Sequence, residues 1–120
     1  MSLFLYNFIS FLSLPFMAIR ILFMSLKDSD YKKHFSNRLG IYKNTTQLKD
    51  IVWFHAVSLG EVISSQKIVK RIAEHENIVL TVATPTGLRE AKKIFGIDVE
   101  VVYAPWDFKW FILNFFKTFK

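Results

Sequence analysis

The residues from 51 to 84, IVWFHAVSLGEVISSQKIVKRIAEHENIVLTVAT, decide the fold. Residues 51–57 (IVWFHAV) and 78–84 (IVLTVAT) are short apolar runs typical of buried strands, and residues 61–76 between them have the spacing of an amphipathic helix. The apolar residues near one face of that helix are Val62, Val69, Ile72 and Ala73. A strand, a helix and a second strand in this order predict two parallel strands joined by a right-handed crossover.

The same alternation continues to the end of the chain. Residues 86–95 (TGLREAKKIF) indicate a second helix, 99–105 (VEVVYAP) a third strand and 107–119 (DFKWFILNFFKTF) a third helix. This βαβαβα series predicts an α/β fold with a partial doubly wound parallel sheet. Because three strands are few for such a sheet, we expect residues 51–120 to form a truncated Rossmann-like domain.

The chain begins with a long apolar run, MSLFLYNFISFLSLPFMAIRILFMSL, over residues 1–26. A helix from Leu3 to Leu26 would reach roughly 36 Å at about 1.5 Å per residue, enough to cross the hydrocarbon layer of a membrane. We therefore expect a membrane-anchor helix over 1–26, with Arg20 extending toward one interface. The alternative is a buried or interfacial helix hinged at Pro15. A cleaved signal peptide fits less well, because a basic start and a cleavage site are both lacking.

Residues 27–50 follow as a basic juxtamembrane segment and linker, with linker-like sequence from 40 to 50. Its basic residues near the apolar run are Lys27, Lys32, Lys33 and Arg38. By the positive-inside rule they place the remainder of the chain in the cytoplasm. They also attract anionic head groups, although a merely solvated collar of charge would look the same.

Composition narrows the function classes. The 120 residues include 13 Phe, and 16 Lys and Arg stand against 10 Asp and Glu, which indicates contact with lipid and favours anionic partners such as phosphorylated lipids. The absence of cysteine excludes disulfides, thiolate metal sites and thiol catalysis. Neither G-x-G-x-x-G nor a P-loop pattern occurs, and the three histidines lack the spacing of metal ligands. We therefore expect neither a nucleotide cofactor nor a metal.

Chemically useful side chains follow each predicted strand, in HAVSLGE (55–61), TPTG (84–87) and YAPWD (103–107). Ligands of open α/β sheets bind beyond the carboxyl ends of the strands, so these three segments should converge on one edge. We expect Glu61, Thr86 and Asp107 to lie there together.

Glu61 is the candidate catalytic residue, because a carboxylate at a helix start beside a strand end can take a proton from a hydroxyl. The spacing Ser58-x-x-Glu61 is also that of a capping box, in which the same carboxylate bonds the amide of the cap residue. His55 could orient a substrate or share a proton, or it could be a structural residue of the strand. From the residues alone, the functional and the structural interpretations stay open for both Glu61 and His55.

The segment TPTG offers hydroxyls and amides at a helix start, where phosphate or sugar hydroxyls bind well. Thr84 is equally a plain helix cap followed by Pro85 at the first helical position. Trp106 could stack on a sugar, and Asp107 also suits an N-cap. Of this region we predict Thr84, Thr86 and Gly87 as substrate-binding residues, together with His55, Ser58 and Gly60.

These motifs occur in an order that resembles a known family. The apolar start, a basic stretch ending in Arg38-Leu39-Gly40, then HAVSLGE, TPTG and YAPWD, is similar to the N-terminal part of the 3-deoxy-D-manno-octulosonic acid (Kdo) transferases. HAVSLGE is the most specific motif, and the resemblance covers essentially all 120 residues.

The resemblance implies a two-domain, metal-independent glycosyltransferase of the GT-B class, anchored to the bacterial inner membrane with its catalytic domains in the cytoplasm. Such an enzyme transfers Kdo from CMP-Kdo to a lipid A precursor in lipopolysaccharide biosynthesis. The family's general base is the glutamate that closes HAxSxGE, which is Glu61 here.

The family is several times longer than the folded part of this chain, and the resemblance assigns donor binding to a second domain. We therefore expect an N-terminal fragment that is inactive alone, with membrane and lipid A precursor as partners and no nucleic acid. The alternative is a non-enzymatic, basic membrane-anchored module that binds anionic lipid.

Overall fold

The computed structural model describes residues 2–31, 33–43 and 50–119. Its elements in chain order are helix α1 (Leu3–Lys27), the 3-10 turn η1 (Ser29–Tyr31), α2 (Phe35–Arg38), β1 (Ile51–Ala56), α3 (Leu59–Ala73), β2 (Asn77–Val82), α4 (Pro85–Phe95), β3 (Glu100–Tyr103) and α5 (Lys109–Thr118). The predicted βαβαβα series is confirmed. Of the linker expected over 40–50, residues 44–49 lie outside the described residues.

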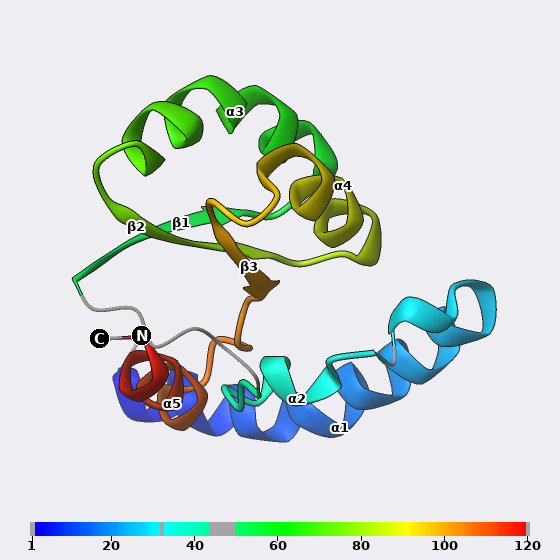
Figure 1. Ribbon diagram of the computed structural model, residues 1–120. Coiled ribbons are helices and arrows are strands. Elements are labelled where there is room, and N and C mark those ends of the chain that lie inside the picture. The colour runs from blue at the N-terminus through cyan, green and yellow to red at the C-terminus, as the bar shows by residue number, and fades with distance from the viewer. Residues whose placement is uncertain (1, 32, 44–49, 120) are drawn as a thin grey trace.

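The strands of the described residues form one parallel sheet in the order β1-β2-β3. Ile51 of β1 pairs with Asn77 of β2, and Val79 of β2 pairs with Glu100 of β3. Helices α3 and α4 cover one face of the sheet, whereas α1, α2 and α5 lie on the other side (Figure 1). Parallel strands with helices on both sides are the predicted α/β architecture.

Both ends of helix α3 differ from the sequence-based expectation. Helix α3 begins at Leu59, two residues before the predicted start, because Ser58 is its N-cap. It ends at Ala73 rather than at position 76, since the amides of His75 and Glu76 both bond to the carbonyl of Ile72 and close the last turn. The predicted boundaries were wrong there because amphipathic spacing continues past the point where the backbone leaves the helix.

The main core lies between the sheet and the helices α3 and α4. Helix α4 contributes Leu88, Ala91 and Phe95, which are spaced three and four residues apart and therefore share one face. Val62 and Val69 of α3 are fully buried, as predicted. The buried residues of this core are Ala56, Val62, Val69, Ile78, Leu80, Val82, Leu88, Ala91, Phe95, Val99, Val101 and Tyr103.

A second, aromatic core covers the opposite face of the sheet. Phe115 of α5 and Phe119 directly after this helix pack there with Val79 and Val102. The ring of Trp53 on β1 lies 4.6 Å from that of Phe115 between centroids. The chain thus leaves the sheet after β3 and returns beneath β1, which is how a doubly wound fold covers its second face.

Helix α1 is continuous from Leu3 to Lys27 and includes Pro15, as expected, and the hinge at Pro15 in the alternative interpretation is not seen. Among the described residues it is the one helix long and apolar enough to cross a membrane by length and composition. It nevertheless runs along the folded domain (Figure 1). The rings of Phe11 and Phe108 lie 6.2 Å apart, and Asp28 forms an ion pair with Arg89 at 3.3 Å.

Candidate functional site

The carboxyl ends of the strands bring the predicted segments to one edge of the sheet. Helices α3 and α4 begin directly after β1 and β2, and their first turns are neighbours. A Cβ added to Gly87 would lie 4.0 Å from the amide nitrogen of Leu59. Beyond β3, the amide of Ala104 bonds to the carbonyl of Val82 at 2.9 Å, which keeps the segment leading to Asp107 at the same edge.

Glu61 forms the capping box with Ser58. The amide of Glu61 donates to Ser58 Oγ at 3.4 Å, and the amide of Ser58 donates to Glu61 Oε2 at 3.3 Å. The amide of Val57 donates to the same Oε2. Both bonds therefore hold one carboxylate oxygen, and within the described residues Oε1 accepts no hydrogen bond. Glu61 is exposed, and its negative charge is favoured at the start of a helix.

The start of α4 follows the helix-cap interpretation. Thr84 Oγ1 accepts a hydrogen bond from the amide of Gly87 at 3.1 Å, and Pro85 is the first residue of the helix. A Cβ on Gly87 would lie 3.1 Å from that Oγ1, so the tight first turn uses the missing side chain. The hydroxyl of Thr86 is exposed and receives a long hydrogen bond of 3.5 Å from Arg89.

His55 lies away from Glu61, on the face of the sheet that α5 covers. Its Nδ1 is 2.9 Å from Thr81 Oγ1, which also accepts a hydrogen bond of 2.8 Å from Trp53 Nε1. Alternate residues of a strand share a face, so His55 and Trp53 both point toward α5. This arrangement fits the structural role for His55, and its part in substrate binding stays a prediction.

A cavity of about 370 Å³ lies next to the strand ends and is closed on one side by α1. Its lining residues from the strand ends and following loops are Val57, Ala83, Thr84 and Trp106, and those from the N-terminal region are Met17, Arg20, Ile21, Met24, Tyr31 and Arg38. Val57 connects this cavity to Glu61, because its amide bonds the Glu61 carboxylate. The cavity therefore adjoins the candidate catalytic residue.

Arg38 gives this cavity an unusual buried positive charge. It is only 5% exposed, its Nη2 donates to the carbonyl of Ala83 at 3.1 Å, and its guanidinium lies 4.6 Å from the ring centroid of Tyr103. Burial lowers the pKa of Arg38, but an arginine remains charged at neutral pH. Its Nε is buried and has no hydrogen-bond partner among the described residues.

Sequence reasoning did not place Arg38 and Arg20 at this cavity. Arg20 was expected to extend toward a membrane interface, and Arg38 to set the membrane orientation and attract anionic head groups. The available signals were the position of Arg38 at the start of Arg38-Leu39-Gly40 and the isolation of Arg20 within an apolar run.

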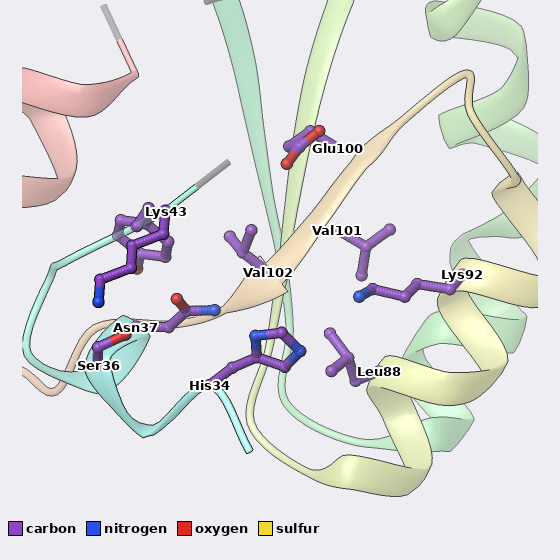
Figure 2. Close-up of a pocket in the computed structure, with 10 residues that line it drawn as sticks. His34, Ser36, Asn37, Lys43, Leu88, Lys92, Glu100, Val101 and Val102 are labelled. Atoms are coloured by element: carbon purple, nitrogen blue, oxygen red, sulfur yellow. The ribbon is translucent and has the colours of Figure 1, made fainter. Parts of the chain in front are cut away.

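A second cavity, of about 420 Å³, lies at the open edge of β3 between α4 and the segment around α2 (Figure 2). Lys92 and His34 border it from opposite sides. None of the predicted site residues lines it, and it is separate from the strand ends where Glu61 lies. The described residues also contain no group of three His, Asp or Glu side chains that could hold a metal ion.

Comparison with known proteins gives matches along most of the chain. The model of a protein family described as 3-deoxy-D-manno-octulosonic-acid transferase (kdotransferase) matches residues 33–120. A 3-deoxy-D-manno-octulosonic acid transferase of Haemophilus influenzae is 30% identical over 116 residues, which are 93% of this chain and 27% of that protein. One from Bordetella pertussis is 36% identical over 63 residues, 48% of this chain and 15% of its own length.

The chain thus spans about a quarter of the length of the Haemophilus relative. No solved structure matches it. The matched region includes every predicted site residue, from His55 to Gly87.

Proposed function

Because the chain belongs to the 3-deoxy-D-manno-octulosonic-acid (Kdo) transferase family, we propose that it forms the acceptor side of a glycosyltransferase of lipopolysaccharide biosynthesis. The reaction is the transfer of Kdo from CMP-Kdo to a sugar hydroxyl of a lipid A precursor. The observation that carries this proposal is a carboxylate, Glu61, fixed at the strand ends beside a cavity with two arginines.

Glu61 is the general base in this proposal. Its carboxylate removes the proton from the acceptor hydroxyl as that oxygen attacks the anomeric carbon of Kdo, and the bond to CMP breaks with its electron pair leaving on the phosphate. The helix-capping role and the catalytic role of Glu61 are compatible. Oε2 is held by the amides of Val57 and Ser58, while Oε1 is directed by that anchorage and can accept the proton.

Arg38 and Arg20 suit a phosphorylated acceptor. Guanidinium groups bind phosphate oxygens in a fixed, planar geometry, and one that is shielded from water binds more strongly than one on the surface. We assign the cavity to an anionic group of the acceptor, with Thr84 at its wall. Gly60 and Thr86 then lie at the neighbouring helix starts, where a backbone amide and a hydroxyl can contact sugar hydroxyls, and Gly87 closes the first turn of α4 against Thr84.

Helix α1 supports attachment to a membrane, which for this function is the bacterial inner membrane. Large apolar side chains cover its exposed side, and Lys27 and Lys33 follow on the side of the folded domain. The positive-inside rule then puts that domain in the cytoplasm. A membrane location also brings the chain to an acceptor that is itself a lipid.

The donor side belongs to a second domain in the GT-B architecture that the family resemblance implies. Bringing both reactants together can supply roughly 7–11 kcal/mol of barrier reduction. We therefore propose that these 120 residues transfer Kdo only together with donor-binding residues.

The test is a complementation assay. The chain is co-expressed with the remainder of a related Kdo transferase, and transfer from CMP-Kdo to a lipid A precursor is measured. We expect Glu61→Gln to lower turnover by about 100-fold or more while circular dichroism stays unchanged, since an amide fills the same space but cannot accept the proton. Glu74→Gln is the matched control, because Glu74 is an exposed carboxylate at the opposite end of the same helix and pairs only loosely with Arg71, at 4.0 Å.

Full transfer by Glu61→Gln would reduce Glu61 to a helix cap. In that case Glu61→Ala should still cost about 0.5–2 kcal/mol of stability through the lost capping contact. If wild type binds anionic vesicles but the complemented assay shows no transfer, the non-enzymatic membrane-binding module is the better description.

A further inference from the structure

Helix α1 exposes a continuous apolar side, unlike a surface helix of a water-soluble domain. On the side toward the domain, Ile21 and Ser25 are buried, and Tyr6, Ser10 and Ser13 are half-buried. The outer side is apolar, with 81% of Phe4, 68% of Phe23 and 81% of Leu26 exposed. A helix side that faces water carries mainly polar residues, so the outer side of α1 is suited to an apolar medium.

Both ends of α1 are attached to the same folded domain. Near its start, the hydroxyl of Tyr6 donates to the carboxylate of Asp107, and just beyond its end Asp28 pairs with Arg89 at 3.3 Å. The distance along a helix from residue 6 to residue 28 is roughly 33 Å at about 1.5 Å per residue, comparable to the hydrocarbon thickness. A helix that crossed the bilayer could keep only one of these two attachments.

We propose that α1 lies in the plane of the membrane surface, with its outer side in the boundary between head groups and acyl chains. This inference rests on the membrane attachment in the proposed function and replaces a crossing helix by an interfacial one. The side chains that enter the lipid are Phe4, Phe8, Leu12, Ile19, Phe23 and Leu26.

The surroundings of α1 identify the apolar medium as an anionic bilayer. At the end of the helix, an apolar hollow formed by Phe23 and Leu26 is bordered by Lys27 and Tyr31. At its start, a hollow formed by Phe8 and Phe11 is bordered by Lys109 and Trp110. Lysine next to an amphipathic aromatic ring is the pattern of side chains at the level of anionic head groups.

An in-plane α1 also positions the cavity that contains Arg20 and Arg38. Four residues of α1 line that cavity, so it would lie at the level of the head groups. A phosphorylated sugar of a lipid acceptor occupies the same level while its acyl chains remain in the bilayer. The helix would thus serve both as the anchor and as one wall of the acceptor site.

Depth measurements test the proposal directly. Because the chain has no cysteine, single substitutions Phe4→Cys, Leu12→Cys and Phe23→Cys can each carry a fluorescent label. In vesicles of phosphatidylethanolamine and phosphatidylglycerol, quenching by spin-labelled lipids should place all three labels at one shallow depth, about 5–10 Å into the boundary. Ser13→Cys is the inner-side control and should be quenched least. A Leu12→Cys label much deeper than the other two would overturn the proposal.

Cross-linking gives a second, independent readout. Tyr6→Cys with Asp107→Cys, and Asp28→Cys with Arg89→Cys, should both be joined by a short bismaleimide in the membrane-bound protein. Joining at only one end would show a crossing helix and overturn the in-plane arrangement. In intact cells, labelling of Ser2→Cys by a membrane-impermeant reagent from outside would do the same.

Two further outcomes separate this inference from the proposed function. Failure to bind any vesicle refutes membrane attachment itself, and with it both proposals about the membrane. Light scattering that shows a stable dimer without lipid, with the outer-side labels shielded, would make that side a contact between copies and would overturn the lipid assignment alone.

Discussion

Helices α4 and α1 pack against the same domain with opposite patterns. Helix α4 buries Leu88, Ala91 and Phe95 and exposes Lys92 and Lys93, as expected in water. Helix α1 buries Ile21 and Ser25 toward the domain and exposes most of its large apolar side chains. The difference is the one expected if the α3/α4 layer faces water and the outer side of α1 faces lipid, as proposed above.

The two helices also differ in what holds them. The attachment of α4 is a continuous apolar core, whereas α1 is attached by separated contacts such as the Phe11–Phe108 ring pair and the Asp28–Arg89 ion pair. Apolar burial contributes stability in proportion to area, while exposed polar contacts contribute little. Loss of the α1 contacts should therefore leave the sheet and its main core folded.

The largest expected effect compares two phenylalanines. Phe95→Ala removes a ring that is 3% exposed and should lower the free energy of unfolding by about 3–5 kcal/mol. Phe23→Ala removes a ring that is 68% exposed and should change it by less than about 0.5 kcal/mol. Urea unfolding followed by circular dichroism measures both.

The order of the two effects should reverse when binding to lipid vesicles is measured instead of stability. Burial of a Phe ring is worth roughly 1.5–3 kcal/mol, so Phe23→Ala should weaken binding to anionic vesicles by about tenfold or more. Equal destabilisation of the folded domain by the two substitutions would show that Phe23 is part of a protein core and would break the comparison.

A smaller effect concerns the junction between the N-terminal region and α5. Gly40 has a φ of 76°, and a Cβ there would lie 2.2 Å from the carbonyl oxygen of Phe111. Gly40→Ala should cost more than about 2 kcal/mol through left-handed strain and overlap. Gly60→Ala is the control, because its nearest neighbour would be Ser58 Oγ at 3.8 Å, and a helical position favours Ala. Thermal unfolding of both variants checks this, and an unchanged midpoint for Gly40→Ala would contradict the close packing.

The aromatic core beneath the sheet predicts a pH effect. Burial raises the pKa of Tyr42 above its ordinary value of 10.0, and its hydroxyl donates to the carbonyl of Tyr103 at 2.9 Å. The folded state holds this proton more tightly than the unfolded state, so the stability it contributes is present below pH 10.0 and declines as the pH rises above that value.

Tyr42→Phe should therefore cost about 0.5–1.5 kcal/mol at pH 7. Above pH 10.0 the unfolding free energy of wild type should fall toward that of the variant. Unfolding curves measured from pH 7 upward test this. If the unfolding free energies of wild type and Tyr42→Phe change with pH in parallel, Tyr42 is not the source of the loss of stability at high pH.

The smallest effect belongs to the ion pair at the end of α1. The side chains of Arg89 and Asp28 are 50% and 32% exposed, so solvent screens their attraction, and Arg89→Ala should cost about 0.2–1 kcal/mol. Hydrogen exchange should nevertheless become faster in the last turns of α1. The control is Arg71→Ala. It removes an ion pair with Glu74 at the end of α3, and it should leave hydrogen exchange in α1 unchanged. Faster exchange in α1 for both variants would mean that the ion pair does not hold the helix.

The sequence by itself determined the order of strands and helices and the two helix N-caps at the site, Ser58 and Thr84. These depend on contacts between near neighbours: alternating apolar runs, Ser58 and Glu61 three residues apart, and Thr84 with Gly87. Such patterns are local, so they can be read without knowing the fold. The prediction that the three strand ends converge followed from the parallel order of the strands alone.

Only the tertiary structure decided which side chains meet across the chain. Arg38 became a buried cation of the cavity through Ala83, 45 residues away, and His55 turned toward Thr81 instead of Glu61, across 26 residues. The position of α1 along the domain depends on the hydrogen bond between Tyr6 and Asp107, which are 101 residues apart. The physical reason is that an apolar helix has the same composition whether it crosses a membrane or lies on it, and only its distant contacts distinguish the two.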